Sequence, residues 1–395
     1  MRAQQTEYKM KAYIDSRHEQ FLKDFQTIVN IDSSSDNKHG IETVARFFET
    51  RFQNIGLDTR VLFLGEDQVP CLYAEHKKAD KPFDVMFLGH MDTVFPAGEA
   101  EKRPFSIRDN KVFGPGVCDM KGGLLVVLHS LEALKHAGIL DSLSLCVAFN
   151  GDEETGSHAS KEWIMETAKK SLRTFVYEPC RPGYRFVLQR KGGGSFHLTV
   201  KGREAHAGAD PEKGVNAVVE LAHQIVRINR LNENDKGTTA QVTVVSGGDK
   251  VNIIPALAEA LVDIRISTPK EKDRVEDFFN TLGDQSFFKD STIRVRGHID
   301  RPPMEAGEAT QKLWDLVRST GKTLDLPMEP ISTGGCSDGN YTSFSGTPTI
   351  DGMGIVGANS HRPDEYAELD SIGNMVLLTA NVCKSILAPG DEPLL

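Results

Sequence analysis

Histidines and carboxylates gather directly after short apolar runs of the chain. The run at 85–88 is followed by His90 and Asp92, whose spacing of two puts both side chains on the same side of an extended backbone. Two further runs, at 143–149 and 174–177, are likewise followed by acidic residues, namely Asp152, Glu153, Glu154 and Glu178. Consecutive acids repel one another, and a divalent cation would relieve that cost. Each group taken alone could equally be a solvated polar turn.

Two other loops carry residues of the same types. The glycine-rich stretch 114–123 places Asp119 just before a predicted helix, where it could serve only as the N-cap. Its glycine spacing fits neither the phosphate-binding loop of NTPases nor the dinucleotide fingerprint. The stretch 359–366 contains His361. Two histidines with several carboxylates suit zinc or a similar ion, and a carboxylate that bridges two ions would form a dinuclear hydrolytic centre.

Strands that alternate with helices must position these groups. The runs at 85–88, 143–149 and 174–177 are short, apolar and rich in β-branched or aromatic residues, which predicts buried strands. Helical patterns at 121–137 and 160–170 lie between them. This alternation predicts an α/β sheet covered on both faces. Ligands of such sheets bind beyond the carboxyl ends of the strands, which is where the histidines and acids fall.

From about residue 192 the pattern changes. Alternating apolar and polar residues predict half-exposed antiparallel strands, and the expected order of elements is β-α-β-β-α-β, a ferredoxin-like unit. We therefore expect an inserted α+β domain over 191–301. The α/β domain that it interrupts would be discontinuous and comprise 1–190 and 302–395. A surface helix is expected over 7–29.

Composition narrows the possible function classes. The chain has 395 residues, with 46 lysines and arginines against 56 aspartates and glutamates, and its formal net charge is −10. That balance argues against nucleic-acid partners, which need a basic surface. No run of about 18 apolar residues predicts a membrane span, and the N-terminal residues show no signal-peptide pattern. The six cysteines form no CxxC pair, so we expect a cytoplasmic protein without a disulfide framework.

Seven motifs along the chain resemble those of the M20 family of metallopeptidases, above all its glutamate carboxypeptidase branch. They lie between about residues 85 and 370 and read GHMDTV, FGPGVCDMKGG, FNGDEETGS, YEP, GREAHAG, VNIIPA and SHRPDEY. The resemblance implies a zinc-peptidase-like catalytic domain with an inserted dimerisation or lid domain. It also implies a metal-dependent hydrolase with two zinc ions per chain, which cobalt or manganese could replace.

The resemblance implies a ligand set for these ions. Asp119 would bridge the two zinc ions. His90 and Glu178 would complete one site, and Glu154 and His361 would complete the other. The family often has a cis peptide bond after the bridging aspartate, so we expect one between residues 119 and 120.

The resemblance also implies roles for two acids that are not ligands. Asp92 would orient the imidazole of His90. Glu153 would act as general base towards the attacking water and then, as general acid, return the proton to the leaving nitrogen. Adjacent residues on an irregular turn can face different ways, so Glu153 and Glu154 can hold separate roles.

Substrate contacts are implied for the inserted domain. His206, in GREAHAG, resembles a histidine that reaches into the partner subunit's active site and polarises the scissile carbonyl. Asn252 and Arg265 resemble groups that hold the substrate, and an arginine can grip a free carboxylate with two hydrogen bonds. Without the resemblance, His206 could be an ordinary loop histidine and Arg265 a surface cation.

The loop after residue 332 departs from the family pattern. Gly334 and Gly335 could bind a substrate carboxylate through backbone N–H groups. Cys336 replaces a glycine of the family pattern and Ser337 a threonine, which leaves the shape of the substrate open.

The sequence therefore predicts a hydrolase that cleaves an amide bond beside a free carboxylate in a small peptide or an N-acyl amino acid. A homodimer through the inserted domain is expected. An N-acyl amino acid deacylase, of the acetylornithine or succinyl-diaminopimelate type, is an alternative because such enzymes share every metal ligand. A non-catalytic binding protein of the same fold is another, against which the presence of Glu153 counts.

Overall fold

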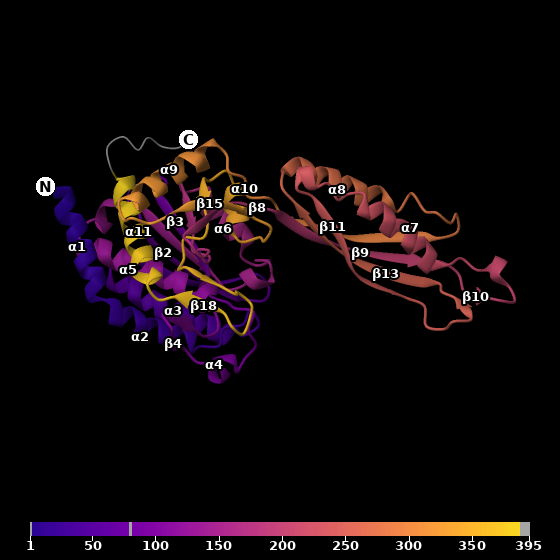
Figure 1. Ribbon diagram of the computed structural model, residues 1–395, viewed down its shortest axis with the longest axis horizontal. Coiled ribbons are helices and arrows are strands. Elements are labelled where there is room, and N and C mark those ends of the chain that lie inside the picture. Colours follow the sequence, from indigo (N-terminus) through magenta and orange to yellow (C-terminus); the bar gives the residue numbers. More distant parts are fainter. Residues whose placement is uncertain (1, 79–80, 388–395) are drawn as a thin grey trace. The chain divides into compact units, whose positions relative to one another are not determined.

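A computed structural model describes residues 2–78 and 81–387 (Figure 1). The chain divides into two compact units. The first unit is made of Met1–Leu188, Ala306–Ser332 and Ser337–Leu395, so far as these are described, and the second of Gln189–Glu305 and Thr333–Cys336. The second unit is thus slightly longer than the expected insertion at 191–301. It also takes in a short stretch that the sequence analysis placed in the other domain.

A mixed sheet lies in the first unit, with the strand order β1-β2-β6-β3-β7-β16. The parallel strands are β3 (Val85–His90), β6 (Leu145–Asn150), β7 (Thr174–Val176) and β16 (Thr349–Ile350). An antiparallel hairpin, β1 (Asp58–Leu64) and β2 (Val69–His76), joins β6 at one side. The strands predicted near residues 85, 145 and 174 are therefore confirmed.

Helices cover both faces of this sheet, as predicted. Within β3, Phe87 belongs to a core shared with α3 (Lys38–Asn54), α5 (Gly122–His136) and α11 (Ser371–Ile386). Its neighbours Met86 and Leu88 point to the other face and pack in a core with residues of α6 (Lys161–Ala168) and α10 (Gly339–Phe344). Burial on both faces explains why these strands read as continuous apolar runs.

The prediction of a single surface helix over 7–29 is wrong. The segment forms α1 (Arg2–Ser16) and α2 (His18–Val29), which meet at Arg17. The reason is packing, because Phe21, Phe25 and Ile28 recur at helical spacing and are buried in the core of the first unit.

Helix α5 starts unusually close to its neighbours. A Cβ atom at Gly123 would lie 2.0 Å from the carbonyl oxygen of Tyr177, and one at Gly122 would lie 2.1 Å from the side chain of Ile355. Only glycine permits this approach. As a result, the loop that ends in Asp119 is held against the segment that follows β7.

A small antiparallel sheet, not foreseen from the sequence, has the order β17-β18-β5-β4. Its members are β4 (Ser106–Arg108), β5 (Lys111–Phe113), β17 (Gly357–Ala358) and β18 (Tyr366–Glu368). Strands of two or three residues are too short to show an alternating pattern. The sheet matters because it pairs the chain just before residue 114 with the chain just after residue 365.

The second unit has the predicted ferredoxin-like order of elements. Its antiparallel sheet, in the order β11-β13-β9-β14, contains β9 (Gly192–Lys201), β11 (Thr239–Gly247), β13 (Leu257–Ile266) and β14 (Thr292–Arg301). Its helices are α7 (Ala217–Asn229) and α8 (Pro269–Leu282). The core joins sheet to helix, with the ring of Phe196 stacked on that of Phe279 at 3.9 Å between centroids.

Of the remaining helices and strands, α9 (Glu308–Lys322) packs in the core of the first unit through Leu313, Trp314 and Val317, and the others are short. The short ones are α4 (Glu99–Lys102), β8 (Arg185–Arg190), β10 (Ala205–His206), β12 (Ile253–Ile254) and β15 (Glu329–Thr333). Over the described ranges, no helix has both the length and the apolar character needed to cross a membrane.

Candidate metal centre

The carboxyl ends of the parallel strands bring the predicted ligands together in the first unit. His90 ends β3, Glu154 lies in a short turn after β6, and Glu178 follows β7. Nε2 of His90 lies 3.1 Å from Oδ1 of Asp119 and 3.7 Å from Oε1 of Glu178. These are the three residues expected to form one metal site.

The second carboxylate oxygen of Asp119 faces a different pair. Nε2 of His361 lies 3.3 Å from Oδ2 of Asp119 and 3.1 Å from Oε2 of Glu154. The peptide bond between Asp119 and Met120 is cis, as expected. We call His90, Asp119, Glu154, Glu178 and His361 the ligand cluster. Within it, Asp119 presents one oxygen to each histidine–glutamate pair.

The spacing of the ligand cluster fits a tetrahedral divalent ion. With metal–ligand bonds of about 2.0–2.1 Å, tetrahedral geometry separates ligand atoms by about 3.3–3.4 Å. The observed separations of 3.1–3.7 Å bracket that value. In addition, Oε1 of Glu154 is buried and accepts no hydrogen bond. Buried polar atoms are rarely left without a partner, so this oxygen also suits a cation.

The electrostatics of the ligand cluster point the same way. Burial raises the pKa of Glu154 to about 7, and burial followed by repulsion from Asp119 raises the pKa of Glu178 well above its usual range. Hydrogen bonds to Asp119 and Glu154 raise the pKa of His361 to about 11. Protons thus balance the buried negative charge, and a divalent cation bound by neutral histidines would replace them.

Access to the ligand cluster comes from the side of His361. Its side chain is 54% exposed, whereas that of His90 is 1% exposed. The backbone of His361 has a φ of +66°, in the left-handed region that residues other than glycine seldom adopt. Such conformations are concentrated at functional sites, where the surrounding structure holds them.

Asp92 joins two parts of the centre. Its Oδ1 accepts a hydrogen bond from the backbone N–H of Glu153 at 3.2 Å, and its Oδ2 accepts from that of Glu154 at 3.1 Å. Oδ2 also accepts from the Ser35 hydroxyl at 2.7 Å. Nδ1 of His90 lies 3.4 Å from Oδ1 and 3.0 Å from the backbone oxygen of Asp92. Asp92 therefore contacts the imidazole of His90, which it is predicted to orient, and also the turn that carries both glutamates.

The carboxylate of Glu153 lies beside the ligand cluster. One of its oxygens, Nε2 or Nδ1 of His90 and an oxygen of Glu178 all lie within 4.8 Å of one another. Glu153 is thus placed within reach of the same centre. By distance alone it could serve as a ligand as well as the predicted base.

Two residues with a clear place in this geometry were missed from the sequence. Glu365 is fully buried and accepts hydrogen bonds from the backbone N–H groups of Gly116, Cys118 and Asp119. Ser35 donates to Asp92. Neither residue type nor spacing distinguishes these from surface residues. The only available signal was that Glu365 lies close in sequence to His361.

The other predicted substrate residues lie in the second unit. His206 is exposed on β10, which pairs with β12, and its Nδ1 accepts hydrogen bonds from the backbone N–H groups of residues 208 and 209. Asn252 is on the neighbouring loop, where its carbonyl accepts from the N–H of Ala207. His206 and Asn252 thus lie on adjacent segments of the second unit, and their roles towards a substrate stay predictions.

Arg265 lies next to Cys336, in the loop after residue 332 that differs from the family pattern. It pairs with Asp263 through Nε at 3.1 Å and Nη2 at 2.9 Å, and its Nη1 lies 3.4 Å from Sγ of Cys336. Gly334 and Gly335 precede this cysteine, and the carbonyl of Gly335 accepts from the Arg190 guanidinium at 3.1 Å. The cysteine side chain therefore occupies space next to the arginine that was expected to grip the substrate.

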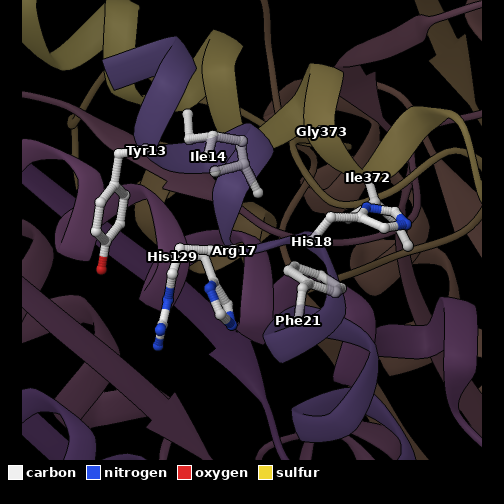
Figure 2. A pocket seen from close by; sticks show the side chains of 9 residues that line it. Tyr13, Ile14, Arg17, His18, Phe21, His129, Ile372 and Gly373 are labelled. Carbon is white, nitrogen blue, oxygen red and sulfur yellow. The ribbon is translucent and has the colours of Figure 1, made fainter. Parts of the chain in front are cut away.

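A separate cavity of about 20 Å³ lies between the N-terminal helices and α11 (Figure 2). Tyr13, Arg17 and Phe21 line it together with His129. Both ring nitrogens of His129 already face carboxylates: Nε2 lies 3.0 Å from Oδ2 of Asp24, and Nδ1 lies 3.4 Å from Oε2 of Glu132. The space suits about one water molecule. None of its lining residues belongs to the ligand cluster, so this cavity is not the reaction site.

Comparisons with known proteins agree with this geometry. The model of peptidase family M20/M25/M40 matches residues 86–385. Carboxypeptidase G2 of Pseudomonas sp. (strain RS-16) is 31% identical over 91% of this chain and 88% of its own length. A succinyl-diaminopimelate desuccinylase of Bradyrhizobium sp. (strain BTAi1 / ATCC BAA-1182) is 29% identical over 74% of this chain and 80% of its own.

A solved structure shares the fold. Aminopeptidase PepT from Bacillus cereus ATCC 10987 aligns with a TM-score of 0.76 and 19% identity, over 94% of this chain and 99% of its own. The family match spans most of the chain, and the ligand cluster lies within it. The chain therefore belongs to the M20/M25/M40 peptidase family and is a metal-dependent hydrolase.

Proposed function

We propose that this chain is a dinuclear zinc hydrolase that cleaves an amide bond beside a free carboxylate. The observation that carries the proposal is the placement of Asp119, whose two carboxylate oxygens face two different histidines, so that it would be able to bridge two ions. His90 and Glu178 would hold one ion with Asp119, and His361 and Glu154 the other. Cobalt or manganese could occupy the same ligands, because carboxylate and imidazole constrain the metal only loosely.

Different residues of the chain have different roles in the proposed hydrolysis. When bound, the metal ions activate water and polarise the scissile carbonyl. Glu153 accepts the proton of the attacking water and returns it to the nitrogen of the leaving amine as the amide C–N bond breaks. Asp92 holds the backbone of Glu153 and the imidazole of His90 at once, so the base and a ligand keep their mutual position.

The substrate would be a small peptide or an N-acyl amino acid with a free carboxylate. Arg265 already pairs with Asp263 through two nitrogens, while its Nη1 faces the weak acceptor Sγ of Cys336, which a carboxylate would replace as the better partner. The backbone N–H groups of Gly334 and Gly335 are further candidates. Carboxypeptidase activity comes first because of the likeness to carboxypeptidase G2, and deacylation second because of the likeness to a desuccinylase.

We also propose a homodimer through the second unit. Helix α7 leaves Val218, Val219 and Val226 exposed, and β11, at one side of its sheet, leaves Val244 and Val245 exposed. An exposed apolar patch beside an unpaired strand edge favours association with a second copy. His206 would then be available to a partner subunit.

All six cysteines are free thiols, which supports the expected cytoplasmic location.

Metal content and hydrolysis, measured on the same preparation, test the proposal. We expect about two ions per chain and loss of activity on chelation, with recovery on adding zinc or cobalt. Release of C-terminal glutamate from acyl-glutamates, against release of succinate or acetate from N-acyl amino acids, separates carboxypeptidase from deacylase. Full activity with a single ion would refute the dinuclear centre. A folded, metal-loaded protein without hydrolysis of either class would favour the binding-protein alternative.

A further inference from the structure

Glu365 is a buried carboxylate that faces the loop before α5, which ends in the ligand Asp119. Its Oε1 accepts hydrogen bonds from the backbone N–H groups of Cys118 at 2.7 Å and of Asp119 at 2.9 Å. Its Oε2 accepts from the N–H of Gly116 at 3.0 Å. The side chain is fully buried, so these three bonds form out of contact with solvent.

The hydrogen bonds of Glu365 join two segments that are far apart in sequence. Strand β18 begins at Tyr366 and pairs with Phe113 of β5, which brings the two segments into register. On one side of that pairing, the backbone N–H of Glu365 closes a turn onto the carbonyl of Arg362, directly after the ligand His361. On the other side lies the loop that ends in Asp119. Glu365 therefore connects a loop that carries one ligand to the segment that carries another.

We infer that Glu365 is a positioning residue that sets the backbone of Asp119 so that each carboxylate oxygen faces its own histidine before metal binds. This inference rests on the proposed metal centre. Glu365 is not one of the proposed ligands, and it acts through the backbone N–H groups of Gly116, Cys118 and Asp119. Partners that orient ligands in this way commonly contribute 10–100-fold to metal affinity or activity.

A carboxylate is the side chain that this position requires. Three N–H donors converge on two oxygens, and a carboxylate is an acceptor at both. In Glu365→Gln, the amide has one oxygen, so its NH₂ group faces either the N–H of Gly116 or the N–H groups of Cys118 and Asp119. In Glu365→Ala, all three donors lose their partner. The loss of positioning should therefore increase from Gln to Ala.

Titration with Co²⁺ measures this positioning directly. Metal-free wild type, Glu365→Gln and Glu365→Ala are titrated with cobalt, and the dissociation constant and the visible absorption spectrum are recorded. We expect about 10-fold weaker binding for the Gln variant and up to about 100-fold weaker binding for the Ala variant, with an altered spectrum. Glu368→Gln, at the end of the strand that follows Glu365, is the matched control and should bind like wild type. Thermal unfolding of the metal-free proteins separates a positioning effect from a loss of fold.

Amide hydrogen exchange on the wild type supplies a measurement that needs no variant. The N–H groups of Gly116, Cys118 and Asp119 should be protected in the metal-free protein, because Glu365 already holds them. Fast exchange there, or wild-type cobalt affinity and spectrum in both variants, overturns the role of Glu365. If wild type itself takes up no cobalt, the proposed metal centre is wrong and the inference falls with it. Wild-type binding with unchanged variants refutes the role of Glu365 alone.

Discussion

Asp92→Asn replaces a buried carboxylate, which only accepts hydrogen bonds, with an amide that both accepts and donates them. Asp92 contacts the imidazole of His90 and the turn that carries Glu153 and Glu154. In the wild type, Oδ1 accepts from the N–H of Glu153, and Oδ2 accepts from the N–H of Glu154 and from the hydroxyl of Ser35. An amide offers one oxygen, so in either orientation its NH₂ group faces a backbone N–H. At least one hydrogen bond to a charged group is therefore lost, and one buried donor is left without a partner.

The magnitude follows from that single broken contact. A hydrogen bond to a charged group contributes about 1.5–3 kcal/mol, and an unsatisfied buried donor costs about 1–3 kcal/mol. Because both figures describe the same contact, they are not added. We expect the free energy of unfolding of the first unit to fall by about 2–3 kcal/mol.

Urea denaturation of the metal-free protein, followed by tryptophan fluorescence, measures this change. The two tryptophans, Trp163 in α6 and Trp314 in α9, both lie in the first unit, so the signal reports that unit alone. Ser35→Ala is the matched comparison, because it leaves the carboxylate with both N–H donors and leaves no buried donor unpaired, so its cost is limited to one hydrogen bond to a charged group, about 1.5–3 kcal/mol.

Metal binding gives a second readout of the same substitution. Asp92→Asn should also weaken cobalt binding about 10–100-fold, because His90 and the turn of Glu154 lose their common anchor. A variant that unfolds at the wild-type urea concentration and binds cobalt with wild-type affinity would show that Asp92 does not connect these parts, and the reasoning would fail.

Three further predictions test other parts of the molecule. Glu153→Gln should lower turnover by about 10²–10⁴-fold and leave the metal content unchanged, so near-normal turnover would remove Glu153 as the base. The pKa of Asp24 lies below its usual 3.8. Burial raises this pKa, but the hydrogen bonds from the imidazole of His129 and the guanidinium of Arg51 lower it by more than burial raises it. This carboxylate therefore contributes stability that is present above pH 3.8 and lost as the pH falls through the folded-state pKa. In urea denaturation, Asp24→Asn should thus be destabilised at neutral pH, with a deficit that shrinks in acid; a deficit independent of pH contradicts this. Val226→Asp with Val245→Asp should convert the proposed dimer to monomer in light scattering at unchanged circular dichroism, and a dimer that persists would place the interface elsewhere.

The sequence by itself determined three central strands of the first sheet, the ferredoxin-like order of the second unit and the gathering of histidines and acids beyond the strand ends, whereas the predicted ligand set came from the family resemblance. These features are local. Buried strands read as short apolar runs, and their carboxyl ends place the residues that follow them at one edge of the sheet. His90, Glu154 and Glu178 could therefore be placed together before any coordinates were known.

Only the tertiary structure decided how these ligands are held. Glu365 and Gly116 are 249 residues apart, and Ser35 and Asp92 are 57 apart, yet the first pair forms a buried hydrogen bond and the second a partly buried one. A side chain that accepts a backbone N–H leaves no periodicity in the sequence, because the donor can belong to any residue. The break between α1 and α2 likewise follows from what α2 packs against. The sequence thus contains the groups that could bind metal, but long-range packing determines which other residues lie close enough to hold those groups in position.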